Sequence, residues 1–184
     1  MSIVILSFGM LGMVGLQAAA IQANRDARLQ SVASSLAREL AEMMRGNKVV
    51  GLRTGSANPY LGDFSNSDGS TPLVPATTDY CMNVSSGTAC SGITAIANAQ
   101  MTEWLARVDS ELPGAHAKIC VDDTPFDSTS GLPAWNCTAG TSSNTVIKLG
   151  WTRGSTNRAN TGSAAFERAT VPSIVLPITP GNIQ

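Results

Sequence analysis

The first 24 residues of this 184-residue chain contain no charged side chain. Residues 8–24 read FGMLGMVGLQAAAIQAN, and Arg25 and Asp26 follow at once. A helix needs about 20 consecutive apolar residues to cross a bilayer, and Met1–Ile21 supplies them. The stretch therefore fits three interpretations: a secretory signal peptide, a membrane anchor, or a helix that packs in the core of a filament.

The apolar pattern does not stop at the first charges. It narrows to a stripe with a spacing of three and four residues, which predicts one helix from Met1 to about Gly46. The stripe consists of Leu29, Val32, Leu36, Leu40 and Met43. Such a helix is about 70 Å long, and the Gly46-Asn47 pair is typical of a helix C-cap. Because the helical pattern runs through Ala18–Ala20, where a signal peptidase would cut, and no basic residues precede it, a cleaved signal peptide is disfavoured.

Three glycines occupy the apolar half, at Gly9, Gly12 and Gly15. Each costs about 0.5–1 kcal/mol relative to alanine inside a helix, and a plain anchor has no need of them. Small residues let neighbouring helices approach closely. Our hypothesis is that this glycine stripe packs against other helices in an assembled bundle, or allows local unwinding when the helix leaves the bilayer.

Charged residues make up 14% of the chain, whereas an average soluble domain has about 25%. The net charge is −1. This balance excludes a strongly basic protein, and nucleic acid is not an expected partner. Arg153, Arg158 and Arg168 are interpreted as a solvated surface rather than a nucleic-acid site.

The chain has four cysteines and one histidine, with no C-x-x-C motif, so a metal site is disfavoured. An even number of cysteines after an apolar N-terminal segment predicts two disulfides in an oxidising compartment. Of the three possible pairings we favour Cys81–Cys90 and Cys120–Cys137, because short loops close cheaply. Each bridge would stabilise the fold by roughly 2–4 kcal/mol.

The remaining pattern predicts an α+β fold. Residues 47–80 show no periodicity and are expected to form a long loop. A second helix over residues 94–112 ends at Pro113-Gly114, and Trp104 on it and Trp151 are expected in the core. Strands are expected over Ala117–Asp122, Thr145–Arg153 and Ala169–Ile178. Because of its prolines, the last is expected to be an edge strand or an extended tail. One face of the middle strand is apolar.

This pattern divides the chain into two parts. Residues 1–24 form the apolar half of the long helix, and residues 25–184 form a globular part. In the globular part the amphipathic half of the long helix packs on a small antiparallel sheet, with the second helix and the two disulfides completing the fold.

No enzyme motif is present: the sequence lacks G-x-S-x-G, a glycine-rich phosphate loop and H-E-x-x-H. His116 is expected to be an exposed loop residue, and Asp122 and Asp123 to be solvated at a strand end. Asp63–Gly69 lacks the acidic spacing of a calcium loop. We therefore expect no catalytic residue, cofactor or metal.

Three stretches of the sequence resemble the type IV pilins. Within that family, they are most similar to the minor pilins known as type IV pilus modification proteins (the PilV type). SIVILSFGMLGMVGLQ (residues 2–17) is similar to the latter part of the family's N-terminal helix. EWLARVDSELPGAHAKICVD (residues 103–122) resembles the family's tryptophan-bearing helix, which ends in Leu-Pro-Gly before a strand. TVIKLGW (residues 145–151) resembles the strand that follows.

The resemblance implies a low-abundance structural subunit that primes pilus assembly and supports a tip adhesin. Its implied partners are other minor pilins, the major pilin, the tip adhesin and the inner-membrane assembly platform. Before assembly the chain would be single-pass in the inner membrane with its globular part in the periplasm, and afterwards it would lie in the pilus.

The sequence departs from the family pattern at its start. Aligned on the apolar run, the family's leader, cleavage site, N-methylated terminus and buried glutamate correspond to no residue here. Two alternatives remain open: a minor pseudopilin of type II secretion, and a membrane-anchored extracytoplasmic binding or adhesion module that recognises a ligand through its Ser/Thr-rich loops.

Overall fold

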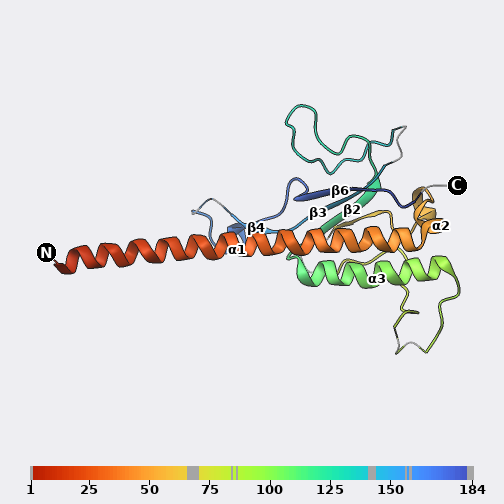
Figure 1. Ribbon diagram of the computed structural model, residues 1–184, viewed down its shortest axis with the longest axis horizontal. Coiled ribbons are helices and arrows are strands. Elements are labelled where there is room, and N and C mark those ends of the chain that lie inside the picture. The colour runs from red at the N-terminus through yellow and green to blue at the C-terminus, as the bar shows by residue number, and fades with distance from the viewer. Residues whose placement is uncertain are drawn as a thin grey trace.

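The computed structural model describes residues 2–65, 71–83, 85, 87–140, 144–155, 157 and 159–181, with only the backbone described for residues 2–12, 14–16, 18 and 19. Its dominant element is α1, Ser2–Gly46, a continuous helix of 45 residues. Figure 1 shows α1 running the length of the molecule, with its N-terminal half extending beyond the rest of the chain. The prediction of one unbroken helix through Arg25 is confirmed.

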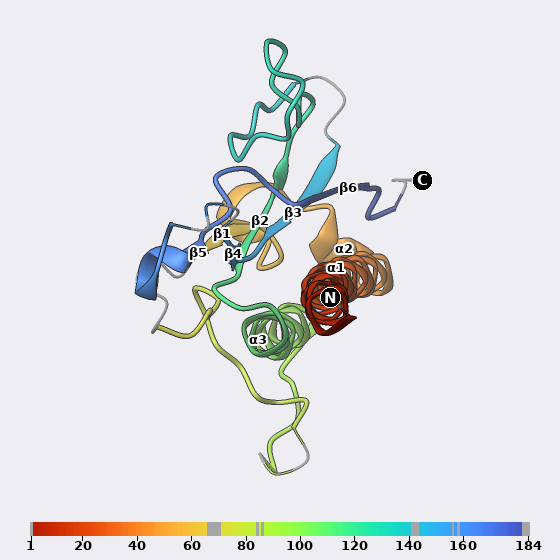
Figure 2. The ribbon, with the colours of Figure 1, turned by 90° about the vertical axis from the view of Figure 1, so that its left-hand side faces the viewer.

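The C-terminal half of α1 lies against α3, Ile93–Glu111, and both helices cover one face of a sheet (Figure 2). Leu36 and Leu40 of the predicted stripe are buried, and Leu29, Val32 and Met43 are half-buried against the same core. Alanines extend the buried face and allow close helix approach; they are Ala33, Ala37 and Ala41. The indole nitrogen of Trp104 on α3 donates a hydrogen bond to the Leu36 carbonyl at 2.9 Å.

The sheet has four antiparallel strands in the order β1-β2-β3-β6. They are β1 Gly62–Ser65, β2 His116–Val121, β3 Thr145–Gly150 and β6 Ile174–Ile178. The register pairs Ala117 with Leu149 and Ile119 with Ile147, so these four side chains face the helices. β6 is an edge strand, as its prolines predicted. A separate two-stranded ribbon consists of β4, Arg153–Gly154, and β5, Phe166–Glu167.

The prediction of a featureless loop over residues 47–80 is wrong. This segment contains α2, Lys48–Gly51, a 3₁₀ turn, Gly55–Ala57, and β1. Helical backbone resumes immediately after Asn47, whose φ is −118°, so the expected Gly-Asn cap does not form. The side-chain amide of Asn47 instead donates a hydrogen bond to the Ile93 carbonyl at 2.8 Å. Contacts with α3, which no local pattern shows, therefore set the path of the chain here.

Both disulfides are present in the expected pairing. Cys81–Cys90 closes a loop before α3, with Cα atoms 4.9 Å apart. Cys120–Cys137 joins β2 to the segment between β2 and β3, with Cα atoms 6.4 Å apart. The second bridge lies on the face of the sheet opposite the helices, because Cys120 alternates with the core residue Ile119.

That opposite face is covered rather than open. All six residues of β3 are buried, including Lys148, so the face opposite the predicted apolar one is covered as well. The covering segment is residues 122–140, which we call the cover loop; Figure 2 shows it on the side of the sheet away from α1 and α3. The fold is therefore three layers: helices, sheet and cover loop.

Candidate assembly interface

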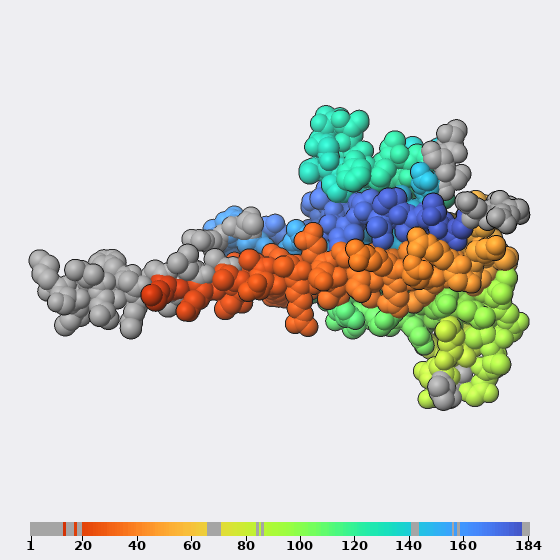
Figure 3. Space-filling view, in the orientation of Figure 1, coloured from red at the N-terminus to blue at the C-terminus, as the bar shows by residue number. Residues whose placement is uncertain are grey.

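The N-terminal half of α1 stands clear of the globular body. Every residue from 20 to 28 is exposed, and Leu29 is the first half-buried residue that packs on the core. Met13 and Ile21 are each 68% exposed. Figure 3 shows the coloured part of α1 running out from the body, with its lower edge free of other segments in this view. A contiguous exposed apolar surface commonly marks a site of contact with a protein or a membrane, so this part of α1 is the candidate interface.

Several predicted features fall outside the part of the chain that the structure describes. Gly9, Gly12 and Gly15 lie within the backbone of α1, but their surroundings are outside the described residues, so their role stays a prediction. Arg158 and residues 66–69, part of the segment compared with a calcium loop, are also outside the described residues. Among the described residues, no helix combines the length and hydropathy needed to cross a membrane.

The amphipathic stripe has an internal role. Leu36 and Leu40 have 3% and 0% of their surface exposed, so the chain's own core covers them. Leu29 and Met43 line the edge of the same core. Trp104 and Trp151 are also buried, as expected. Leu29, Leu36, Leu40 and Met43, which were predicted to pack against other helices, therefore pack within the globular body of this chain.

A buried ion pair holds the cover loop to the sheet. Lys148 Nζ lies 2.6 Å from Asp122 Oδ2, and both side chains are fully buried. The ammonium also donates to the carbonyls of Ala134 and Asn136, at 2.6 Å each. These three acceptors match the three protons of the ammonium. The arrangement is a structural clamp rather than an activated amine.

The prediction that Asp122 is solvated is wrong. Its Oδ1 accepts hydrogen bonds from the backbone N–H groups of Thr124 and Thr138, at 3.0 Å each. Burial alone would raise the pKa of the Asp122 carboxyl. The Lys148 contact and the two N–H donors outweigh burial, so the pKa lies below its ordinary value. The strand-end position of Asp122 indicated solvent, but the cover loop excludes it.

His116 is likewise not an exposed loop residue. It begins β2 and stacks on Trp135 of the cover loop, with ring centroids 3.7 Å apart. Its Nε2 lies 2.7 Å from Asp63 Oδ1, and Lys118 Nζ lies 2.9 Å from Asp63 Oδ2. Burial would raise the pKa of Asp63, but hydrogen bonds from Lys118 and His116 outweigh it and lower the pKa. The cluster joins β1, β2 and the cover loop.

Trp135 explains a glycine in the middle of the fold. A Cβ atom added at Gly150 would lie 2.8 Å from the indole of Trp135, so the aromatic ring needs the bare backbone of β3 beneath it. Sequence patterns singled out neither residue as a contact. The signal was available in part, because a glycine within a predicted strand often marks a site where another group approaches the backbone closely.

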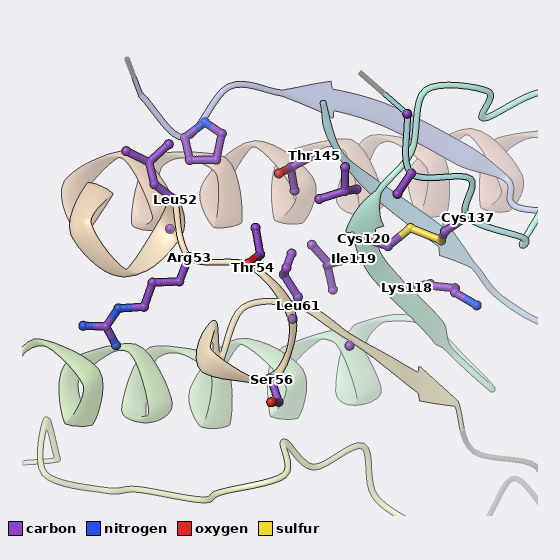
Figure 4. A pocket seen from close by; sticks show the side chains of 17 residues that line it. Leu52, Arg53, Thr54, Ser56, Leu61, Lys118, Ile119, Cys120, Cys137 and Thr145 are labelled. Carbon is purple, nitrogen blue, oxygen red and sulfur yellow. A yellow bond between two sulfur atoms is a disulfide. The ribbon is translucent and has the colours of Figure 1, made fainter. Parts of the chain in front are cut away.

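Figure 4 shows a groove of about 880 Å³ between the segment after α2 and β2. Arg53 and Lys118 line it, but both are engaged: Arg53 donates to Thr94 Oγ1 and Lys118 pairs with Asp63. The Cys120–Cys137 disulfide forms part of the wall. Among the described residues, Cys120, Asp122 and Cys137 also form the one cluster with metal-ligating atoms close together. Its two sulfurs are already joined to each other, so the cluster is no metal centre.

Comparisons with protein-family models, with curated proteins and with solved structures each find no match for this chain. The structure itself defines the class: an α+β protein with a long N-terminal helix, a four-stranded antiparallel sheet and two disulfides. Because disulfides persist in oxidising compartments, they indicate a protein outside the cytoplasm.

Proposed function

We propose that this protein is a structural subunit of the type IV pilin class, acting as a minor pilin that primes pilus assembly and forms part of the tip complex. The observation that carries the proposal is α1. One half of this unbroken helix is packed into the core, and the other is uncharged in sequence and stands outside the body. The resemblance of residues 2–17, 103–122 and 145–151 to minor pilins supports the same assignment.

The physical basis is that the exposed half needs an apolar environment. Burial of apolar surface is worth roughly 25 cal/mol per Å², and two environments provide it: a bilayer and the helical core of a filament. Transfer from one to the other keeps the surface away from water throughout. The proposed subunit waits in the inner membrane with its body in the periplasm, where its disulfides form. The assembly platform then moves it into contact with other minor pilins, the major pilin and a tip adhesin.

Site-specific cross-linking in the producing cell tests this proposal. A photo-reactive amino acid replaces Met13 or Ile21, both exposed on the free half of α1, and in a control it replaces Val49, which is 59% exposed on α2 at the other end of the body. We expect Met13 and Ile21 to cross-link to other proteins with apolar N-terminal helices in sheared surface filaments. Cross-links only to type II secretion subunits would favour a pseudopilin. An absence of protein cross-links would contradict an assembly role.

The glycine stripe yields a separate prediction. Replacing Gly9, Gly12 and Gly15 together with leucine should lower incorporation into filaments roughly tenfold, which corresponds to a loss of about 1.4 kcal/mol, because the larger side chains keep neighbouring helices apart. Membrane insertion should be unchanged, because leucine is at least as apolar as glycine. Quantitative blotting of sheared filaments and of alkali-extracted membranes measures the two effects.

The matched control replaces the same three glycines with alanine, which keeps the side chains small and should preserve most of the incorporation. Normal incorporation of the leucine variant would show that the stripe makes no close contact.

A further inference from the structure

A second groove lies where α1 leaves the globular body. Its volume is about 420 Å³, and we call it the neck groove. One wall is α1 and the other is the β4–β5 ribbon with the residues before it. The lining residues are Gln22, Arg25, Asp26, Leu29, Pro113, Thr152, Arg153, Gly154, Ser155 and Phe166. Figure 1 shows β4 at the end of the body from which the free half of α1 emerges.

The neck groove combines positive charge with apolar surface. Arg25 and Arg153 line it against a single carboxylate, Asp26. The Arg153 guanidinium lies 5.0 Å from the centroid of the Trp151 ring, which supports it from below. Phe166 is 59% exposed beside these charges, and Leu29 is only half-buried. Two arginines beside an uncovered aromatic ring match a ligand with an anionic head and an apolar body.

The position of the neck groove along α1 identifies the ligand. At 1.5 Å per residue, the part of α1 from Ser2 to Ile21 spans about 30 Å, close to the roughly 30 Å hydrocarbon core of a bilayer. If this stretch spans the membrane, as in the proposed function on which this inference rests, Arg25 lies at the level of the lipid headgroups. The ribbon wall brings Arg153 and Phe166 to the same level from a distant part of the sequence.

We propose that the neck groove holds the phosphate of an anionic glycerophospholipid while the subunit is in the membrane. Guanidinium groups match phosphate oxygens in bidentate geometry, so Arg25 and Arg153 bind the headgroup from two sides. Phe166 lies at the interface, where aromatic side chains are enriched, and packs with Leu29 on the glycerol and first acyl carbons. Asp26 disfavours a second phosphate.

Lipid selectivity of the full chain tests the proposal. The protein is reconstituted into phosphatidylcholine vesicles that contain a trace of dansyl-labelled phosphatidylglycerol or dansyl-labelled phosphatidylcholine. Energy transfer from the native tryptophans reports proximity, because Trp151 lies directly under Arg153. We expect the phosphatidylglycerol probe to be enriched at the protein, and Arg25→Gln/Arg153→Gln to lower that enrichment at least fivefold, since each basic residue near an anionic surface contributes about fivefold.

The matched control is Arg38→Gln/Lys48→Gln, which removes the same charge at exposed positions farther along the body. It should keep the enrichment. Equal enrichment of the two probes, or equal loss in both double variants, would overturn the proposal for the neck groove. Alkaline extraction of the same vesicles reports insertion separately. Loss of the wild-type chain from the vesicles would refute the membrane-bound state and, with it, both the proposed function and this inference.

Discussion

Replacing Lys148 with methionine is expected to lower the free energy of unfolding by about 3–5 kcal/mol, the usual cost of removing one partner of a buried ion pair. The Asp122 carboxylate would keep its two backbone N–H donors but lose its cation. The carbonyls of Ala134 and Asn136 would lose their donor as well. Guanidinium unfolding under non-reducing conditions, followed by tryptophan fluorescence, measures the change.

The fold supplies a matched control on the neighbouring strand. Lys118 is the cross-strand partner of Lys148 and also pairs with an aspartate, but its partner Asp63 is 47% exposed. Lys118→Met should therefore cost no more than about 1 kcal/mol. The double variant Asp122→Asn/Lys148→Met should recover part of the loss, because it removes the uncompensated charge. A loss below 1 kcal/mol for Lys148→Met alone would contradict the clamp.

Replacing Trp104 with alanine is expected to have an effect of similar size, about 3–5 kcal/mol. Trp104 is fully buried between α1 and the rest of the core, and its indole N–H bonds the Leu36 carbonyl. The substitution leaves a cavity at the contact between α1 and α3. Because that contact fixes the angle at which α1 leaves the body, proteolysis within residues 25–46 should also become faster. Unfolding curves and limited proteolysis measure the two effects.

Two further variants separate packing from the hydrogen bond. Trp104→Phe keeps most of the ring and loses only the N–H donor, so it should cost less than half as much as alanine. Tyr80 is 59% exposed, and Tyr80→Ala should change stability by no more than about 0.5 kcal/mol. Similar losses for Tyr80→Ala and Trp104→Ala would mean that Trp104 does not carry the contact.

Elements with a strong local pattern were predictable from the sequence. The spacing of Leu36 and Leu40 fixes the buried face of α1, and alternation in residues 145–151 locates β3. β1 was missed because Gly62–Ser65 is short and mostly polar, and only its pairing with β2 makes it a strand. The burial of His116, Asp122 and Lys148 depends on where the cover loop lies. No local periodicity carries that information, so their environments were predicted wrongly or not at all.

The candidate assembly interface follows a similar division. The uncharged stretch before Arg25 and the unbroken pattern after it predict one continuous helix, and the structure contains that helix. The neck groove could not be predicted, because Arg153 and Phe166 reach Arg25 only through the tertiary fold. The ring under Arg153 belongs to Trp151, which the sequence placed in the core without indicating its charged neighbour.

The unbroken course of α1 has a mechanical consequence. Tension applied to the free half enters the body along the helix axis and reaches the core first at Leu29 and then at the fully buried Ala33. Neither disulfide lies on this load path, since both close loops after the helix has ended. Resistance to extraction of the helix therefore depends on non-covalent packing around Trp104, and reducing agents should leave the rupture force of α1 nearly unchanged.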